Sequence, residues 1–251
     1  MSTPIERQLV VFDFDWSLAD QDSDRWIFEV LAPELRRKMK NLKKEMQWTD
    51  LVAMSLRELH EKGATREDIE NALRQMPFHP AMVRGVTALK NKSPPQTTFL
   101  CLSNANIVFI TTILKSKGLE NLFNEIITNP AEWDASGLLK LRRRIDPNGP
   151  QHQCKAGCSP NMCKGDELEA FLQRHPAFDR VIYVGDGSND FCPVMLKTLF
   201  SAAAIAACMA LSKGMKKAAA LHAKCAIGQA LGKSKKYSDN SDTNVRVELR
   251  A

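Results

Sequence analysis

The sequence predicts an α/β protein with a Rossmann-like parallel sheet, and two similar stretches support this prediction. Residues 8–15, QLVVFDFD, form an apolar run typical of a buried strand, and the run ends at Asp13 and Asp15. Residues 180–190, RVIYVGDGSND, repeat the pattern with a Gly-rich turn that presents Asp186 and Asp190. Because ligands of open α/β sheets bind at the carboxyl ends of the strands, these acidic turns mark the expected site.

The DxD pair allows two interpretations. Two neighbouring carboxylates resist joint ionisation unless a cation neutralises them, or unless one keeps its proton and serves as an acid. A DxD pair taken alone is more often a solvated turn. The second acidic turn favours a functional site, since its glycines let the backbone approach a ligand closely.

Helical patterns fill the chain between the first strand and the next. They cover residues 26–39, 49–63 and 65–76, with Thr49 or Asp50 capping the second and Thr65 capping the third. Helices inserted here would cover the strand ends and form a cap suited to a small substrate. We expect a catalytic core over residues 1–19 and 78–200 and a cap over residues 20–77, with His79 as a hinge residue without chemistry.

The later elements add two candidate site residues. We expect a helix over residues 81–92, a strand over 97–103, a further strand over 124–129 and then a hairpin whose run of arginines, residues 142–144, is a solvated face. Ser103 ends its strand just before a helix, whose N-terminus favours an anion beside the Ser103 hydroxyl, although a Ser in this place is usually only a cap. Lys164 opens the helix over residues 166–175, and because a cation opposes the helix dipole there, we expect it to have an anionic partner.

Together these motifs resemble the haloacid dehalogenase (HAD) superfamily of phosphotransferases. Within it they resemble the phosphoethanolamine/phosphocholine phosphatase group, which includes pyridoxal-phosphate phosphatases and plant pyrophosphate-cleaving relatives. The resemblance covers about residues 8–193 and depends on DFDWSLADQDSD from Asp13, HP from His79, LSNAN from Leu102, SPNMCKG from Ser159 and GDGSNDFCP from Gly185.

The resemblance implies roles for these residues. Asp13 would attack phosphorus and form an aspartyl-phosphate, and Asp15 would protonate the leaving alcohol and then deprotonate the water. Ser103 and Lys164 would hold the phosphoryl oxygens. The implied ligands of Mg²⁺ are Asp13, the backbone carbonyl of Asp15 and Asp186, with Asp190 in support.

Substrate preference depends on two positions where the group is thought to present acidic residues to a cationic amine. Asp24 is present in this sequence, whereas the residue after Ser103 is Asn104 instead of Asp. The loss of one carboxylate argues against assuming an amine head group. Pyridoxal phosphate, thiamine phosphate and pyrophosphate therefore remain open as substrates, and the expected partner is a small phosphorylated metabolite. Motif one also departs from the group, with Trp16 beside the nucleophile and Ser17 where Thr is commoner.

Residues 152–163 gather His152, Cys154, Cys158 and Cys163. These four could form a zinc site of the Cys₃His type, although the spacing is not a standard structural-zinc pattern. A loop of reduced cysteines is the alternative. The chain has seven cysteines and no signal-peptide pattern, so we expect reduced thiols in a cytoplasmic protein.

The C-terminal segment, residues 201–251, differs in composition from the rest. It holds nine Lys or Arg against three Asp or Glu and so accounts for the whole net charge of +6. The charge therefore indicates neither a nucleic-acid nor a membrane partner for the catalytic part. Its Ala-rich stretch has helix propensity and its end has a disordered composition. We expect the sheet to end before it, and an altered splice or gene model to explain it better than a native basic helix.

Two functions of other classes stay open beside a phosphatase. One is a catalytically inactive HAD-like binding or regulatory protein, which the atypical C-terminal segment favours and the intact Asp13, Asp15, Lys164 and Asp186 oppose. The other is docking of the basic C-terminal segment to anionic lipid or nucleic acid. Oligomeric state is not predicted.

Overall fold

A five-stranded parallel sheet forms the centre of the part of the chain that the computed structural model describes, residues 4–156, 158–194 and 205–209. Its strand order is β3-β2-β1-β6-β7, and each neighbouring pair is parallel. The predicted α/β parallel architecture is therefore confirmed. The strands are β1 (Arg7–Phe12), β2 (Gln96–Asn106), β3 (Glu125–Asn129), β6 (Arg180–Gly185) and β7 (Ile205–Met209).

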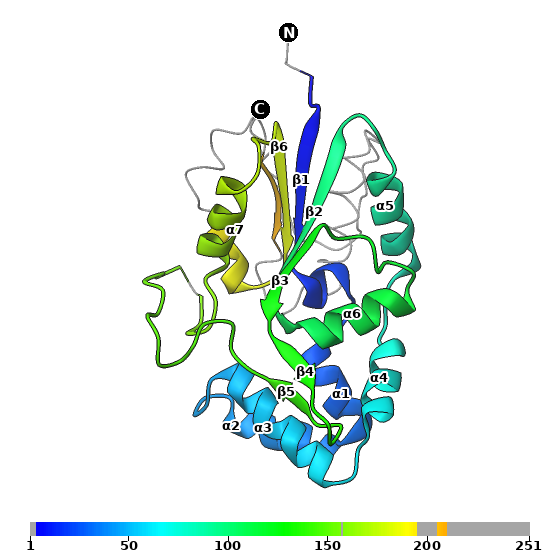
Figure 1. The fold of residues 1–251 in the computed structure, drawn as a ribbon, viewed down its shortest axis with the longest axis vertical. Coiled ribbons are helices and arrows are strands. Elements are labelled where there is room, and N and C mark those ends of the chain that lie inside the picture. The colour runs from blue at the N-terminus through cyan, green and yellow to red at the C-terminus, as the bar shows by residue number, and fades with distance from the viewer. Residues whose placement is uncertain (1–3, 157, 195–204, 210–251) are drawn as a thin grey trace, which may run out of the picture.

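Helices cover both faces of the sheet. Figure 1 shows α5 (Pro80–Lys90) and α6 (Ile107–Ser116) on one side and α7 (Lys164–Gln173) on the other. Alternate side chains of β1 divide between these layers: Val10 and Phe12 join the core on the α5 and α6 side, and Leu9 and Val11 join the core on the α7 side. This burial on both faces explains the uninterrupted apolar run that predicted the strand.

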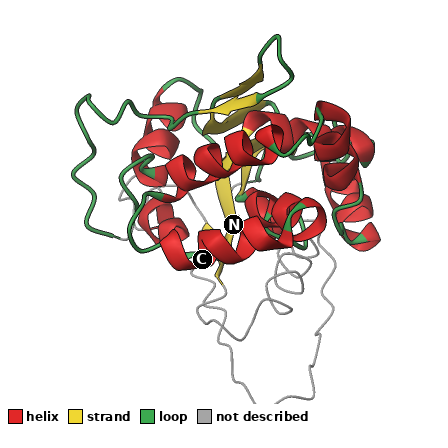
Figure 2. Cartoon of the chain, turned by 90° about the horizontal axis from the view of Figure 1, so that it is seen from below, coloured by secondary structure: helices red, strands yellow, loops and turns green. Residues whose placement is uncertain are grey.

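A helical cap follows β1, as predicted. It lies beyond the carboxyl ends of the strands, at the bottom of Figure 1, and the view from below in Figure 2 shows its helices in front of the sheet. A two-stranded antiparallel hairpin of β4 (Ala131–Trp133) and β5 (Leu139–Leu141) packs beside it. The cap helices are α1 (Ser23–Leu31), α2 (Pro33–Leu42), α3 (Trp48–Glu61) and α4 (Arg66–Arg74).

Two details of the cap differ from expectation. The single helix expected over residues 26–39 is two helices, because Pro33 lacks the N–H that would continue α1 and instead opens α2. Neither Thr49 nor Asp50 caps α3: the helix begins earlier, and Gln47 is its N-cap and accepts a hydrogen bond from the backbone N–H of Asp50. The predicted Thr65 cap is confirmed, as part of a capping box at α4.

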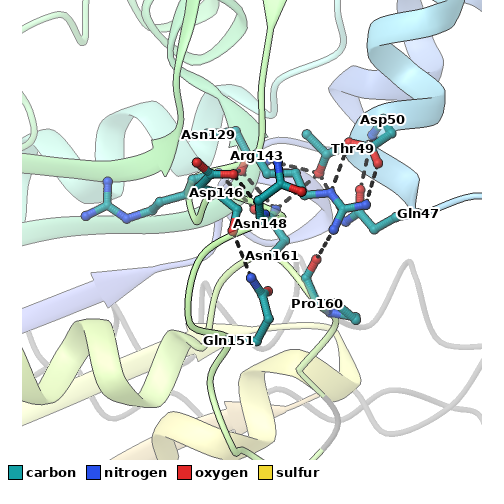
Figure 3. A network of polar contacts seen from close by, with 11 residues as sticks. Gln47, Thr49, Asp50, Asn129, Arg143, Asp146, Asn148, Gln151, Pro160 and Asn161 are labelled. Atoms are coloured by element: carbon teal, nitrogen blue, oxygen red, sulfur yellow. Dashed lines mark hydrogen bonds and ion pairs between the residues drawn. The ribbon is translucent and has the colours of Figure 1, made fainter.

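The run of arginines is exposed at Arg142 and Arg144, as expected, but two of its three members also form ion pairs. Arg143 forms an ion pair with Asp50 of α3 and donates to the carbonyl of Pro160 at 3.1 Å (Figure 3). Arg144 donates to Glu167 of α7, with Nη2 2.9 Å from Oε2. The loop between β5 and α7 is thus tied to both the cap and the core.

A buried amide network makes a second connection between cap and sheet. Asn161 Nδ2 donates to the Thr49 hydroxyl of α3 at 3.1 Å and to Asn129 Oδ1 at 2.9 Å (Figure 3). Asn129 in turn donates to the backbone carbonyl of Asn104 at 2.6 Å. Asn129 thus links the end of β2 to the loop residue Asn161 and, through it, to α3.

The sheet extends further than the sequence predicted. Strand β7 pairs in parallel with β6 and includes residues of the Ala-rich stretch, so the expectations of helix there and of a sheet ending before it are wrong for Ile205–Met209. Pairing along the edge of β6 outweighs the helix propensity of alanine, which is a weak preference. The rest of the C-terminal segment, with its basic residues, lies outside the described residues. Among the helices that are described, none has the length and apolar character needed to cross a bilayer.

Candidate active site

The carboxyl ends of β1, β2 and β6 and the start of α1 enclose a pocket of about 310 Å³. Most of the predicted site residues line it together, whereas Lys164 and Asp190 lie behind Asp13 and are not among the lining residues described. The predicted residues that line the pocket are Asp13, Asp15, Asp24, Ser103, Asn104 and Asp186.

Asp13 is fixed by contacts on both carboxylate oxygens. It follows directly after β1, and its backbone N–H donates to the carbonyl of Val184 at 2.8 Å. Oδ1 accepts from the Phe14 N–H at 2.7 Å, and Oδ2 lies 2.9 Å from Lys164 Nζ. Burial raises the pKa of Asp13 to about 7, against the attraction of Lys164. Additional positive charge near Asp13 would therefore favour its carboxylate form.

Lys164 has the anionic partner that its place at a helix start predicted. Its Nζ lies 2.6 Å from Asp190 Oδ1 and 2.9 Å from Asp13, and the lysine side chain has no exposed surface. Burial alone would lower the pKa of Lys164, but the two carboxylates raise it above its ordinary value. Asp190 also accepts from the Tyr183 hydroxyl at 2.7 Å and from the Gly187 N–H at 2.9 Å. The lysine is thus held as a cation between two carboxylates.

Asp15 is presented by a sharp turn, η1 (Phe14–Leu18). Trp16, the next residue, has φ of 59°, a left-handed conformation that is strained for a bulky side chain. The Asp15 carboxylate accepts from the N–H of Ser23 at 2.9 Å and from its hydroxyl at 3.2 Å. Burial, followed by the charges of Asp22 and Asp24, raises the pKa of Asp15 well above its ordinary value. Such a carboxyl can hold a proton for donation.

Ser103 and Asn104 lie at an irregularity of β2. The pairing of β2 with β3 shifts register between Leu102 and Asn106, and both Ser103 and Asn104 fall inside this interruption. The Ser103 hydroxyl accepts from the Ala105 N–H at 3.3 Å. The irregularity lets three successive residues, Ser103 to Ala105, line the pocket in place of alternate ones.

The cap side of the pocket includes three residues that the sequence did not identify. Asp22 caps α1 and pairs with Arg25 at 2.9 Å, and the Arg25 guanidinium lies 5.3 Å from the centroid of the Trp48 ring. Trp48 Nε1 donates to Asp24 at 2.9 Å. Burial, with the charge of Asp22, raises the pKa of Asp24 to about 7. The acidic run over residues 20–24 could have signalled Asp22, but no sequence signal linked Trp48 of α3 to this site.

The donor set beside Asp13 suits a divalent cation. Carboxylate oxygens of Asp13, Asp186 and Asp190 lie within 4.8 Å of one another. Hard cations such as Mg²⁺ prefer oxygen ligands of this kind. Because Asp190 already accepts from Lys164, Tyr183 and Gly187, it fits a supporting place better than a direct ligand position.

The chain also matches a known protein family. The model of the family described as Putative Phosphatase matches residues 8–226. The match continues beyond residue 193, where the sequence resemblance was expected to end, and so includes part of the C-terminal segment. The family model thus also matches residues 201–226 of the C-terminal segment, for which an altered splice or gene model was expected.

Relatives with similar sequences are named as phosphatases or pyrophosphatases. Inorganic pyrophosphatase 2 of Arabidopsis thaliana is 36% identical over 188 residues, 74% of this chain and 65% of the relative. Pyridoxal phosphate phosphatase PHOSPHO2 of Bos taurus is 33% identical over 192 residues, 74% of this chain and 76% of the relative. The chain thus spans slightly less than two thirds of the length of the plant pyrophosphatase.

Solved structures share the fold. A substrate-bound phosphoserine phosphatase has a TM-score of 0.54 at 17% identity, covering 86% of this chain and 92% of that chain. A HAD family hydrolase from Salmonella enterica has a TM-score of 0.54 at 14% identity, covering 76% of this chain and 60% of that chain. With the family match, these similarities show that the chain belongs to the Putative Phosphatase family, a family of phosphatases with the HAD fold.

Proposed function

We propose that the chain is a Mg²⁺-dependent phosphatase that hydrolyses a small phosphomonoester or pyrophosphate through an aspartyl-phosphate on Asp13. The observation that carries this proposal is the placement of Asp13 at the end of β1, with one oxygen 2.9 Å from Lys164 and Asp15 two residues further on in the same pocket. A carboxylate held beside a buried cation is a suitable nucleophile, and the second carboxyl is a suitable proton donor.

Asp13 and Asp15 divide the chemistry. An Asp13 oxygen forms a bond to phosphorus while the bond from phosphorus to the leaving oxygen breaks, and protonated Asp15 gives its proton to that oxygen. Water then attacks the aspartyl-phosphate and passes a proton back to Asp15, and the bond from Asp13 to phosphorus breaks. The raised pKa of Asp15 supports its part, because the carboxyl must begin the cycle protonated.

The surrounding residues bind and orient the phosphoryl group. Ser103 lines the pocket and can donate its hydroxyl to a phosphoryl oxygen. Lys164 lies behind Asp13, so we assign it first as a positioning residue that holds the Asp13 carboxylate in its ionised form. Asp13, the backbone carbonyl of Asp15 and Asp186 would hold Mg²⁺, with Asp190 in support. The bound ion would offset the charge of the phosphoryl oxygens.

The cap side of the pocket bears on the substrate. Asp22 and Asp24 place carboxylates there, and Arg25 and Trp48 add a cation and an aromatic ring. This mixture suits a substrate whose small leaving group has a cationic or neutral polar part, such as phosphoethanolamine, phosphocholine or pyridoxal phosphate. Pyrophosphate stays in the proposal because a 36%-identical relative is named for it.

The test is phosphate release from a panel of phosphomonoesters and pyrophosphate, with Mg²⁺ and with EDTA. We expect metal-dependent release that falls to background in Asp13→Asn. Release should persist in Asp134→Asn, the matched control. Asp134 lies in the hairpin turn, far in sequence from the residues that line the pocket. Equal release by Asp13→Asn would overturn the proposed nucleophile. A folded chain without release from any substrate would instead favour an inactive binding protein.

A further inference from the structure

Four cysteines meet on the α7 side of the sheet. The Sγ atoms of Cys154, Cys158, Cys163 and Cys192 lie within 4.8 Å of one another. Two come from the loop between β5 and α7, one is the N-cap of α7 and one belongs to α8 (Phe191–Val194). We refer to these four residues as the four-cysteine cluster.

The spacing of the sulfur atoms suits a tetrahedral metal. Cys192 Sγ lies 3.3 Å from the Sγ of Cys154 and 3.5 Å from that of Cys163. Four thiolates about 2.3 Å from a central zinc ion have sulfur atoms about 3.8 Å apart. A disulfide would instead bring one pair to about 2.0 Å. These two separations are a few tenths of an ångström shorter than in zinc geometry, and the remaining sulfur pairs lie within 4.8 Å.

The backbone around the cluster is arranged to receive the sulfur atoms. Cys154 Sγ accepts from the Ala156 N–H at 3.4 Å, and Cys163 Sγ accepts from the Asp166 N–H at 3.5 Å. Hydrogen bonds of this kind orient metal ligands. A Cβ at position 165 would lie 2.5 Å from Cys192 Sγ, so a larger residue than Gly165 would displace this sulfur atom.

The fourth ligand position is occupied by a residue other than the one expected from the sequence. His152, which completed the expected Cys₃His set, is not in the cluster, and its Nε2 contacts the carbonyl oxygen of Ser159 at 2.8 Å. Cys192 takes this place instead. It follows the turn η2 (Ser188–Asp190) after β6, so only the packing of α7 against α8 brings it to Cys163.

We propose that the four-cysteine cluster binds one structural Zn²⁺. Four thiolates form a soft, closed donor set, which selects zinc over Mg²⁺ and leaves no open position for catalysis. This site is separate from the carboxylates that line the pocket, and the proposal does not depend on the chain being an active phosphatase.

The metal would join the two segments that carry the buried ion pair behind Asp13. Cys163 directly precedes Lys164, and Cys192 follows Asp190 by two residues. A cross-link at these positions would hold α7 against α8 and so keep Lys164 within 2.6 Å of Asp190. It would also anchor the loop between β5 and α7. We therefore assign zinc a positioning role, one step removed from the reaction.

The first test measures metal content in the full chain, purified in reducing buffer and dialysed against EDTA. We expect one zinc per chain, and visible bands of a tetrahedral cobalt thiolate after replacement by Co²⁺. Cys192→Ser and Cys154→Ser should each lose the tightly held metal. His152→Ala and Cys101→Ser should keep it, because His152 contacts Ser159 and Cys101 is buried in β2.

If the cysteine variants do not fold, a second measurement tests whether the four-cysteine cluster binds zinc. Alkylation of the native wild-type chain, mapped by mass spectrometry, should spare all four cysteines until zinc is removed. Rapid alkylation of the cluster in metal-replete protein, a disulfide within it, loss of zinc in His152→Ala, or iron as the bound metal would each overturn the proposal.

Discussion

Lys164 Nζ donates a hydrogen bond to Asp190 Oδ1 at 2.6 Å, and neither side chain has any exposed surface. Asp13 occupies the other side of the same ammonium at 2.9 Å. One buried cation therefore pairs with two carboxylates, which follow different strands. Lys164 thus connects the ends of β1 and β6 electrostatically. Removal of its charge should lower both the stability and the activity of the protein.

Lys164→Met should destabilise the fold strongly. The variant keeps the volume of the side chain but leaves Asp13 and Asp190 buried without their cation, and breaking a buried pair in this way costs about 3–5 kcal/mol. Urea denaturation would measure the change in the free energy of unfolding, and phosphate release should fall to background.

The matched control for this change is Lys140→Met. Lys140 also pairs with an aspartate, Asp134, at 3.4 Å, but its side chain is 61% exposed. Exposed ion pairs contribute little, so the denaturation midpoint should stay close to that of the wild type. Equal losses in the two variants would contradict the assignment of a special role to the buried pair.

Asp24 should make the metal-free protein less stable as pH rises. Its folded pKa is raised to about 7, so the folded chain keeps a proton that the unfolded chain releases near pH 4. The free energy of unfolding should therefore fall by up to about 1.4 kcal/mol per pH unit between these two values. Asp24→Asn should remove this part of the dependence, as measured by urea denaturation at about pH 5 and about pH 7 in EDTA.

Asp134→Asn serves as the control for the pH dependence. A hydrogen bond from Ser136 is the main reason that the pKa of Asp134 is lowered to about 2, so this group is ionised in both states over the tested range. Its variant should keep the wild-type slope. An unchanged slope in Asp24→Asn would show that Asp24 does not titrate as described.

Gly185→Ala should disturb the site from within the sheet. A Cβ at this last residue of β6 would lie 2.7 Å from the Cβ of Asp190, which cannot move without losing Lys164 and Tyr183. Overpacking of this kind costs about 1–3 kcal/mol. Thermal unfolding and phosphate release should both decline. Gly149→Ala, where the nearest atom is the Asp146 carbonyl oxygen at 3.4 Å, should leave both unchanged.

The sequence predicted the parts of the molecule whose signals are local. The apolar run before Asp13, the Gly-rich turn before Asp190 and the capping box at Thr65 each depend on neighbouring residues, and each was found. The anionic partner of Lys164 followed from the charge of a helix terminus, which is also local. Such signals depend on residues that are close in the chain, so they can be identified from a single sequence.

The parts that were missed depend on long-range packing. Trp48 reaches Asp24 only because the start of α3 returns to the start of α1, and Cys192 reaches Cys163 only because α7 packs on α8. No local pattern links either pair. Strand β7 was missed for a related reason, because pairing with β6 rather than its own composition makes Ile205–Met209 a strand.

Asn104→Asp should shift the substrate preference toward amine head groups. Asn104 and Asp24 line the same pocket, so the change restores a second carboxylate beside a cationic leaving group. We expect the ratio of kcat/KM for phosphoethanolamine to that for pyridoxal phosphate to rise about tenfold, equivalent to about 1.4 kcal/mol, a little above the usual contribution of an exposed ion pair. Asn189→Asp adds the same charge elsewhere on the pocket wall and should change the ratio less. A similar rise in both variants would indicate a general effect of charge, and no rise in Asn104→Asp would remove position 104 from the determinants of specificity.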